Sequence, residues 1–403
     1  MGKRELLLIL GFAVVGTLVY HLTARPSAES SSHFSVNAVV DHLRRAVSGN
    51  QANAEVVTTE THALSAATTE IRVTFPNGNA ESLTIAGEDR QDVASELKVW
   101  SNGYDEAEAQ RLAKSTVLKQ SEAGGRMTFT LTFPRQARQR ANLVVRVPAS
   151  LRVGVVRYGG KLTVTGVKEV ESVESRGEAT IRNVAGRATL SHRSGELTLA
   201  DLGALKLTTN GTDVKLSRVR GDATIQARAG EIVASELEGA VDIEGNNTDI
   251  TVQVLEASKA PVHVSATSGS VRIRGARTDT RVDARNADVV VDVAQAAPVA
   301  VYSEGGGSIE LTAPRGGFQL DAASTAGGQI SAPASWPAVK TAGSEQHASG
   351  AVNGGGPIIT LRSTQGEIVV RDAGDPVPAG VPAPPRPPRP PSAPKLERKL
   401  DAR

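Results

Sequence analysis

Three aspartates recur at turns of a repeated pattern: Asp213, Asp249 and Asp288. Carboxylates stacked at such intervals are oxygen ligands of the kind that Ca²⁺ prefers. The calcium-binding nonapeptide repeat, however, needs Gly-Gly-x-Gly-x-Asp, which this chain lacks. Asn and Asp at turns also bond to the backbone of the turn itself. We therefore interpret the three aspartates as turn residues and predict no metal site.

The seven histidines are scattered, and no two of them have the spacing of metal ligands. His263 falls on an outward position of the pattern, and His192 lies at a corner. None is placed beside a matched nucleophile and acid. The chain has no cysteine, which excludes a thiolate metal site and a cysteine nucleophile. The sequence therefore predicts no catalytic residue, no cofactor-binding residue and no cofactor.

Basic side chains at outward positions are the candidates for a binding face. They are Lys206, Lys215, Arg272 and Arg274. The whole chain carries 45 basic and 43 acidic residues, a net charge of +2, so no strong field points to nucleic acid. We expect this face to bind a cell-surface polymer or an envelope protein.

The element that must position these residues is a repeat of short strands and tight turns. A glycine recurs every eight to ten residues, at Gly177, Gly186, Gly195, Gly203, Gly211, Gly221, Gly230 and Gly239. Between the glycines apolar and polar residues alternate, as in Leu197-Thr198-Leu199, which is the pattern of a half-buried strand. Gly and Asn suit the corners because they adopt positive φ at little cost.

Similar turns recur after 35 to 39 residues, or about four strand–turn units. This longer period predicts coils of roughly eighteen residues with two strands each. The fold class is therefore all-β, with a β-solenoid over residues 161–371. A flexible insertion rich in Ala, Ser and Gly interrupts it at about residues 331–356.

The regions on either side of the repeats differ in composition. Residues 71–160 predict a small mixed α+β cap at the N-terminal end, with one helix at about residues 105–119. Residues 372–403 hold ten of the twenty prolines between Pro376 and Pro394, which predicts a disordered Pro/Arg-rich tail.

The N-terminal segment, residues 1–25, places Lys3 and Arg4 before an apolar run of seventeen residues. This pattern predicts an uncleaved transmembrane anchor with a cytoplasmic N-terminus. A cleavable signal peptide is the alternative, although the small-residue cleavage sites match poorly. The location predicted is the bacterial inner membrane, with the bulk of the chain periplasmic or extracellular. Residues 26–70 are expected to form a linker with a short helix.

Several motifs of the chain resemble the bacterial "putative adhesin" repeat domain, a domain of unknown function. They are the Val145–Val153 segment, the repeated Ser/Thr-x-x-Gly turns and the unit Gly355–Ile368. The resemblance covers most of residues 70 to 371. It implies a β-solenoid in the cell envelope and carries no catalytic residues over to this chain.

Three functions remain open from the sequence. The first is a non-enzymatic, membrane-anchored adhesin or envelope scaffold. The second is an envelope-stress or regulatory partner that senses through the solenoid. The third is an enzyme acting on polysaccharide, against which only Tyr302 and Phe318 supply aromatic rings between residues 160 and 330.

Overall fold

The computed structural model describes residues 52–373, except for residue 79 and residues 135–137. About two thirds of these residues lie in strands, and the one helix among them is α3 (Glu106–Ser115). The predicted membrane anchor and almost all of the predicted Pro/Arg-rich tail lie outside the described residues. Within the described part of the chain, no helix is both long enough and apolar enough to cross a membrane.

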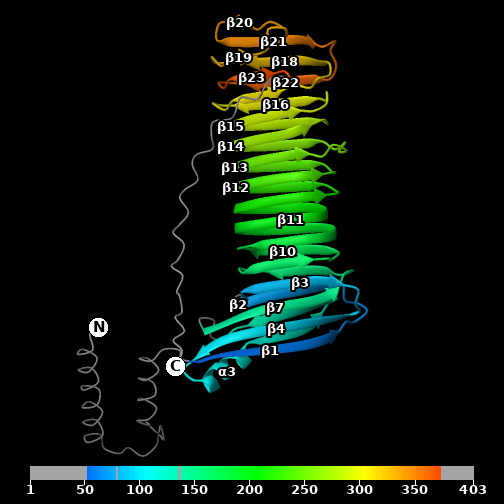
Figure 1. The fold of residues 1–403 in the computed structure, drawn as a ribbon, viewed down its shortest axis with the longest axis vertical. Coiled ribbons are helices and arrows are strands. Elements are labelled where there is room, and N and C mark those ends of the chain that lie inside the picture. The colour runs from blue at the N-terminus through cyan, green and yellow to red at the C-terminus, as the bar shows by residue number, and fades with distance from the viewer. Residues whose placement is uncertain (1–51, 79, 135–137, 374–403) are drawn as a thin grey trace, which may run out of the picture. The chain divides into compact units, whose positions relative to one another are not determined.

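The repeat region winds into coils that stack on one another (Figure 1). Leu205 pairs in parallel with Ala223, eighteen residues later, and Val214 pairs in the same way with Ile232. The strands are β10 (Glu169–Ser175), β11 (Ala179–Val219), β12 (Ala223–Leu237), β13 (Val241–Val254), β14 (Val262–Ala276), β15 (Thr280–Val293), β16 (Val299–Glu304) and β17 (Ile309–Thr312). The prediction of two strands and about eighteen residues per coil is therefore confirmed, and the repeat is β-solenoid-like.

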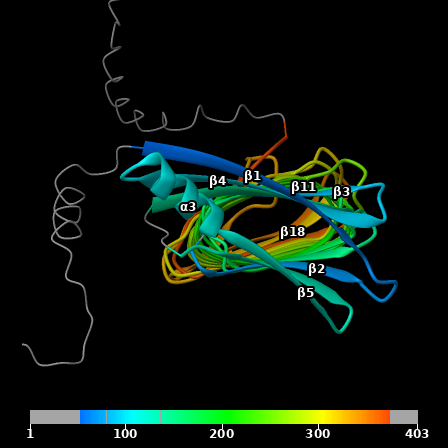
Figure 2. The same ribbon diagram turned by 90° about the horizontal axis from the view of Figure 1, so that it is seen from below.

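Viewed along the stack, the strands form two layers (Figure 2). One apolar core runs between these layers. Leu197 and Leu199 are buried, whereas Thr198 between them faces outward and is partly exposed. Alternation of this kind puts every second side chain into the core. Other aliphatic residues in the same alternating pattern, such as Leu205, Leu207, Ile250 and Val252, are buried as well.

The segment predicted to be an N-terminal cap contributes coils of its own to the stack. β2 lies between β6 and β8, and β3 lies between β7 and β9, in parallel. β1, β4 and β5 pair antiparallel and form this end of the stack together with α3. These strands are β1 (Ala52–Ala63), β2 (Glu70–Asn77), β3 (Ser82–Glu88), β4 (Asp92–Gly103), β5 (Val117–Ala123), β6 (Arg126–Thr132), β7 (Gln139–Pro148), β8 (Arg152–Val156) and β9 (Lys161–Thr165).

Strand β1 corrects the prediction of a linker for residues 52–63, whereas residues 26–51, with the predicted short helix, lie outside the described residues. β1 pairs along its whole length with β4. Its side chains are mostly exposed or half-buried, and Val57 is 52% exposed. The sequence therefore lacks the strong apolar alternation that would mark a buried strand.

Helix α3 is shorter than the predicted helix over residues 105–119. Its beginning has the geometry of a capping box: the Asp105 carboxylate accepts a hydrogen bond from the Glu108 backbone N–H at 2.7 Å. The Glu108 carboxylate in turn accepts from the Tyr104 N–H at 2.7 Å. Val117, which was predicted on the helix, begins β5 instead and is 41% exposed. A β-branched residue is well suited to a strand that pairs with β6.

The predicted flexible insertion at residues 331–356 is also wrong, because this segment forms a hairpin. Its strands are β20 (Lys340–Ala342) and β21 (Glu345–Val352), and β21 pairs antiparallel with β18 (Phe318–Ser324). Trp336 packs edge-on against Phe318, with ring centroids 5.4 Å apart. The hairpin covers an edge of β18 that would otherwise expose unpaired backbone groups.

The last repeat unit is not the last coil of the stack. β22 (Ile358–Ser363) lies between β16 and β18, and β23 (Ile368–Arg371) lies between β17 and β19 (Ile330–Ser331). Figure 1 shows β22 and β23 inserted in this way. The chain therefore returns to complete the stack from within, and both edges of this unit are paired.

Candidate functional site

The four predicted binding residues are all exposed, but they do not share one face. We define face A as the outer surface of residues 205–210, 223–228, 241–246 and 262–267, which pair in register. Face B is the outer surface of residues 214–219, 232–237, 250–254 and 271–276. Lys206 lies on face A, whereas Lys215, Arg272 and Arg274 lie on face B.

The predicted basic face is therefore divided between two sheets, because successive strands of a coil belong to opposite layers. On face B, Lys215 is already held by an ion pair with Glu196, Nζ to Oε1 2.6 Å. This hydrogen bond raises the pKa of Lys215. No ion pair among the described residues includes Lys206, Arg272 or Arg274.

The three aspartates lie at turns, as predicted, but their hydrogen bonds reach the next coil and not the backbone of their own turn. The Asp213 carboxylate accepts from the Glu231 N–H on the next coil at 3.2 Å. Asp288 accepts from the Ser308 backbone N–H at 2.9 Å and from its hydroxyl at 2.7 Å. The Asp249 carboxylate accepts from the Ser270 hydroxyl at 2.7 Å. Each carboxylate thus links one coil to the next.

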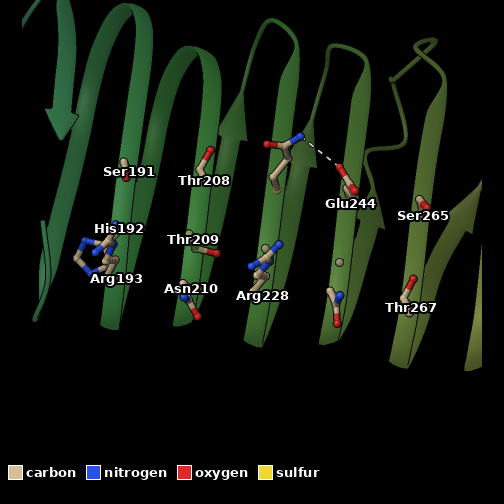
Figure 3. Close-up of a pocket in the computed structure, with 14 residues that line it drawn as sticks. Ser191, His192, Arg193, Thr208, Thr209, Asn210, Arg228, Glu244, Ser265 and Thr267 are labelled. Atoms are coloured by element: carbon tan, nitrogen blue, oxygen red, sulfur yellow. Dashed lines mark hydrogen bonds between the residues drawn. The ribbon is translucent and has the colours of Figure 1, made fainter. Parts of the chain in front are cut away.

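Face A carries a polar groove of about 480 Å³ that crosses several coils (Figure 3). Its outward lining residues are Ser191, Arg193, Thr208, Asn210, Gln226, Arg228, Glu244, Asn246, Ser265 and Thr267. In Figure 3, Arg193, Asn210, Arg228 and Thr267 lie near the same end of successive strands. This groove was not predicted from the sequence, although the Asn and Arg residues before successive turns were its signal.

The floor of the groove is made of small residues at inward positions. Ala227 and Gly245 line it directly, and Ala266 occupies the same register on the next coil. Farther from the corner the inward residues are larger, such as Ile225 and Ile243. Small side chains let the two layers approach where the chain turns from one sheet to the other.

The charges in the groove are only partly compensated. Gln226 donates a hydrogen bond from Nε2 to the Glu244 carboxylate at 3.2 Å. The ion pairs among the described residues include neither Arg193 nor Arg228, both of which are exposed. Two guanidinium groups are therefore available to an acidic ligand.

A second hollow, of about 730 Å³, lies at the opposite corner of the coils. Three of its four charged lining residues are paired, because Arg152 binds Glu169 at 2.8 Å and Glu171 binds Arg72, which lies outside the lining, at 3.2 Å. Arg187 is its one charged lining residue outside the ion pairs of the described residues. The groove on face A is therefore the better candidate for binding a charged partner.

His192 lies beside the groove but is buried, with 1% of its surface exposed. Its Nδ1 is 2.9 Å from the Ser175 hydroxyl, and its Nε2 is 3.1 Å from the Gly177 carbonyl oxygen. Burial lowers the pKa of this imidazole. The neutral ring links neighbouring coils, and its two nitrogens are occupied by these contacts.

We expect His192 to make the fold sensitive to mild acid. The pKa of His192 is lower in the folded state than its ordinary value of 6.5 in the unfolded chain. The contribution of the neutral imidazole to the free energy of unfolding is therefore fully present above pH 6.5 and is lost as the pH falls toward the folded-state pKa. Urea denaturation at pH 7.5 and 5.5 measures the free energy of unfolding. Its decrease between the two pH values should be smaller for His192→Gln than for the unchanged chain. Equal losses in the two proteins would show that His192 does not titrate on unfolding in this range.

Several solved structures and one family model are similar to the chain. Solved structures similar to the chain include a "putative cell adhesion protein" from Clostridium sporogenes ATCC 15579, at 8% identity over 80% of this chain and 100% of that chain, TM-score 0.19. Another is a "putative adhesin" from Parabacteroides merdae ATCC 43184, at 10% identity over 78% and 95%, TM-score 0.31. At these scores the similarity supports no conclusion about this chain. No curated protein matches the chain.

A family model described as Toastrack DUF4097 matches residues 62–306, which is more than half of the chain. The match confirms the resemblance to a repeat domain of unknown function that the turn motifs indicated. The chain belongs to the Toastrack DUF4097 family.

Proposed function

We propose that this protein is a non-enzymatic binding module of adhesin type. The observation that supports this proposal is the outer surface of the repeat region. Its strands pair into a continuous sheet, each coil presents polar side chains outward, and face A carries a groove lined by such side chains. Outward side chains on neighbouring coils are spaced about 4.8 Å apart along the stack. A regular polar surface of this kind suits a repeating polymer better than a single small molecule.

The described part of the structure gives this surface the support that a binding module needs. The core beneath it is continuous from Ile71 to Val370. Turn carboxylates such as Asp213 and Asp288 tie neighbouring coils together. The outward residues are therefore held in a fixed register, and little order has to be gained when a ligand binds.

We further propose that the N-terminal segment anchors this module in the bacterial inner membrane and places the repeats outside the cytoplasm. The support is Lys3 and Arg4 before the apolar run from Leu6 to Leu22. This location would bring the polar faces into contact with envelope polymers.

The proposal predicts that the full-length chain, purified in detergent, binds whole bacterial cells or isolated envelope polymer and releases no product from a panel of polysaccharides. Co-sedimentation measures the binding, and reducing-end release measures cleavage. The unfolded chain at the same concentration is the control. Absence of binding together with steady cleavage of any polymer would contradict the proposal.

A further inference from the structure

We propose that the groove on face A binds an anionic polysaccharide, with Arg193 and Arg228 contacting its acidic groups. This inference rests on the proposed function, because it names where on the repeat region a surface polymer binds and what charge it carries.

The first argument is that Arg193 and Arg228 are outside the ion pairs that hold several basic residues of the described repeat region, and they share this with Lys206 on the same face. Lys215 binds Glu196 at 2.6 Å, Arg218 binds Asp201 at 2.6 Å and Arg285 binds Glu304 at 2.7 Å. Each of those pairs joins one coil to the next. Among the described residues, no such pair is formed by Arg193 or Arg228. Their guanidinium groups remain free to bind a carboxylate or sulfate through two parallel hydrogen bonds.

The second argument is the order of side chains along the stack. Asn210, Arg228 and Asn246 occupy one register position on three successive coils. Arg193 lies on the coil before Asn210 (Figure 3). The two arginines are thus two coils apart, which is about 9–10 Å at the usual strand spacing. Amides lie between and beside them, and amides can donate to and accept from sugar hydroxyls.

This alternation fits an extended polysaccharide that runs along the stack axis. Such a chain presents acidic groups at regular intervals and hydroxyls between them. Arg193 and Arg228 would take the acidic groups, and Asn210 would bind the hydroxyls between them. The polymer would cross several strands, so its binding depends on coils that are separate in the sequence.

The third argument concerns neutral sugars, which are commonly held by stacking on aromatic rings. The groove lining contains no aromatic side chain. Its attraction for a polymer must therefore come from charge and hydrogen bonds, and this favours an acidic ligand over a neutral one.

Glu244 is the carboxylate of the groove lining, and it opposes an anionic ligand. It accepts a hydrogen bond from Gln226 at 3.2 Å, which leaves its negative charge in place. An anionic ligand should therefore bind more tightly when this charge is removed. The opposite effects of Arg228→Gln and Glu244→Gln are a signature that a neutral ligand would not produce.

The test uses the full-length chain in detergent and polygalacturonate as the probe, with dextran as the neutral comparison and polyglutamate as the anionic polypeptide. We expect polygalacturonate to bind the unchanged chain. It should bind Arg193→Gln or Arg228→Gln about tenfold more weakly. Glu244→Gln should bind it more tightly. Arg272→Gln and Arg274→Gln on face B are the matched controls, since they too are exposed arginines, and they should leave binding unchanged. All of these positions are exposed, and the thermal transition of each variant should stay at its original temperature.

The outcomes separate this inference from the proposed function. Polygalacturonate binding that depends on Arg272 or Arg274 would move the site to face B and leave the proposed function intact. Equal binding of dextran, or of polyglutamate, would overturn the anionic polysaccharide as the ligand. Binding to whole cells without binding to either glycan would overturn the inference alone. Failure to bind cells or any polymer would overturn the proposed function as well.

Discussion

The Gly230→Ala variant is expected to lose about 3–5 kcal/mol of the free energy of unfolding, the largest effect among the turn glycines considered. Gly230 has a φ of +102°, which L-residues rarely adopt. A Cβ at this position would lie 2.3 Å from the Thr212 carbonyl oxygen and 2.8 Å from its carbon. These are backbone atoms of the neighbouring coil, so relief of the clash requires two paired strands to separate.

Alanine substitutions at two other glycines separate the cost of a positive φ from the cost of the clash between coils, both measured as a decrease in the free energy of unfolding. Gly211 has a φ of +66° and nothing within 4 Å of an added Cβ, so Gly211→Ala should cost about 1 kcal/mol. Gly306 also has open space and no positive φ, so Gly306→Ala should be nearly neutral. Urea denaturation followed by circular dichroism measures all three. Equal losses at Gly230 and Gly211 would show that contact between coils is unimportant.

The second large effect is expected at Leu361, in the strand that returns into the stack. Leu361 is fully buried and pairs with Val301 on one side and Ala322 on the other. Replacement by Ala removes core volume where neighbouring backbone is fixed on both sides. We expect Leu361→Ala to lower the free energy of unfolding by about 2–5 kcal/mol.

Ile358, three residues earlier in the same strand, is the matched control. It is 55% exposed, so Ile358→Ala should change the free energy of unfolding by less than about 0.5 kcal/mol. Hydrogen exchange should also show β18 losing protection in Leu361→Ala, because β18 pairs with β22. Similar small losses for both variants would contradict the insertion of β22 between β16 and β18.

Much of the repeat region could be predicted because its rules are local. The alternation in Leu197-Thr198-Leu199 assigns each side chain to the core or the surface, and burial agrees with that assignment. The turn period likewise predicts the register that joins Leu205 to Ala223. Asp213 and Asp288 lie at turns, as predicted, but their carboxylates bond to the backbone of the next coil and not to their own turn, which only the stacking of coils decides.

The errors share a different cause, which is pairing between segments far apart in the chain. β1 and β21 bury little apolar surface of their own and are held by partners that their local sequence does not specify. The order of coils at the C-terminal end was missed for the same reason. Val117 was placed on a helix because its spacing fits one, but pairing with β6 decided otherwise.

The sequence by itself determined the class of fold, the length of a coil and which side chains face outward. It could not determine which outward side chains meet, because that depends on the sheet to which each strand belongs. Lys206 and Lys215 are nine residues apart and both exposed, yet they lie on different faces. Arg193 and Arg228 are much farther apart in the chain, yet the stacking of coils brings them into one groove. Only the tertiary structure converts a one-dimensional repeat into a surface with a defined pattern of charge.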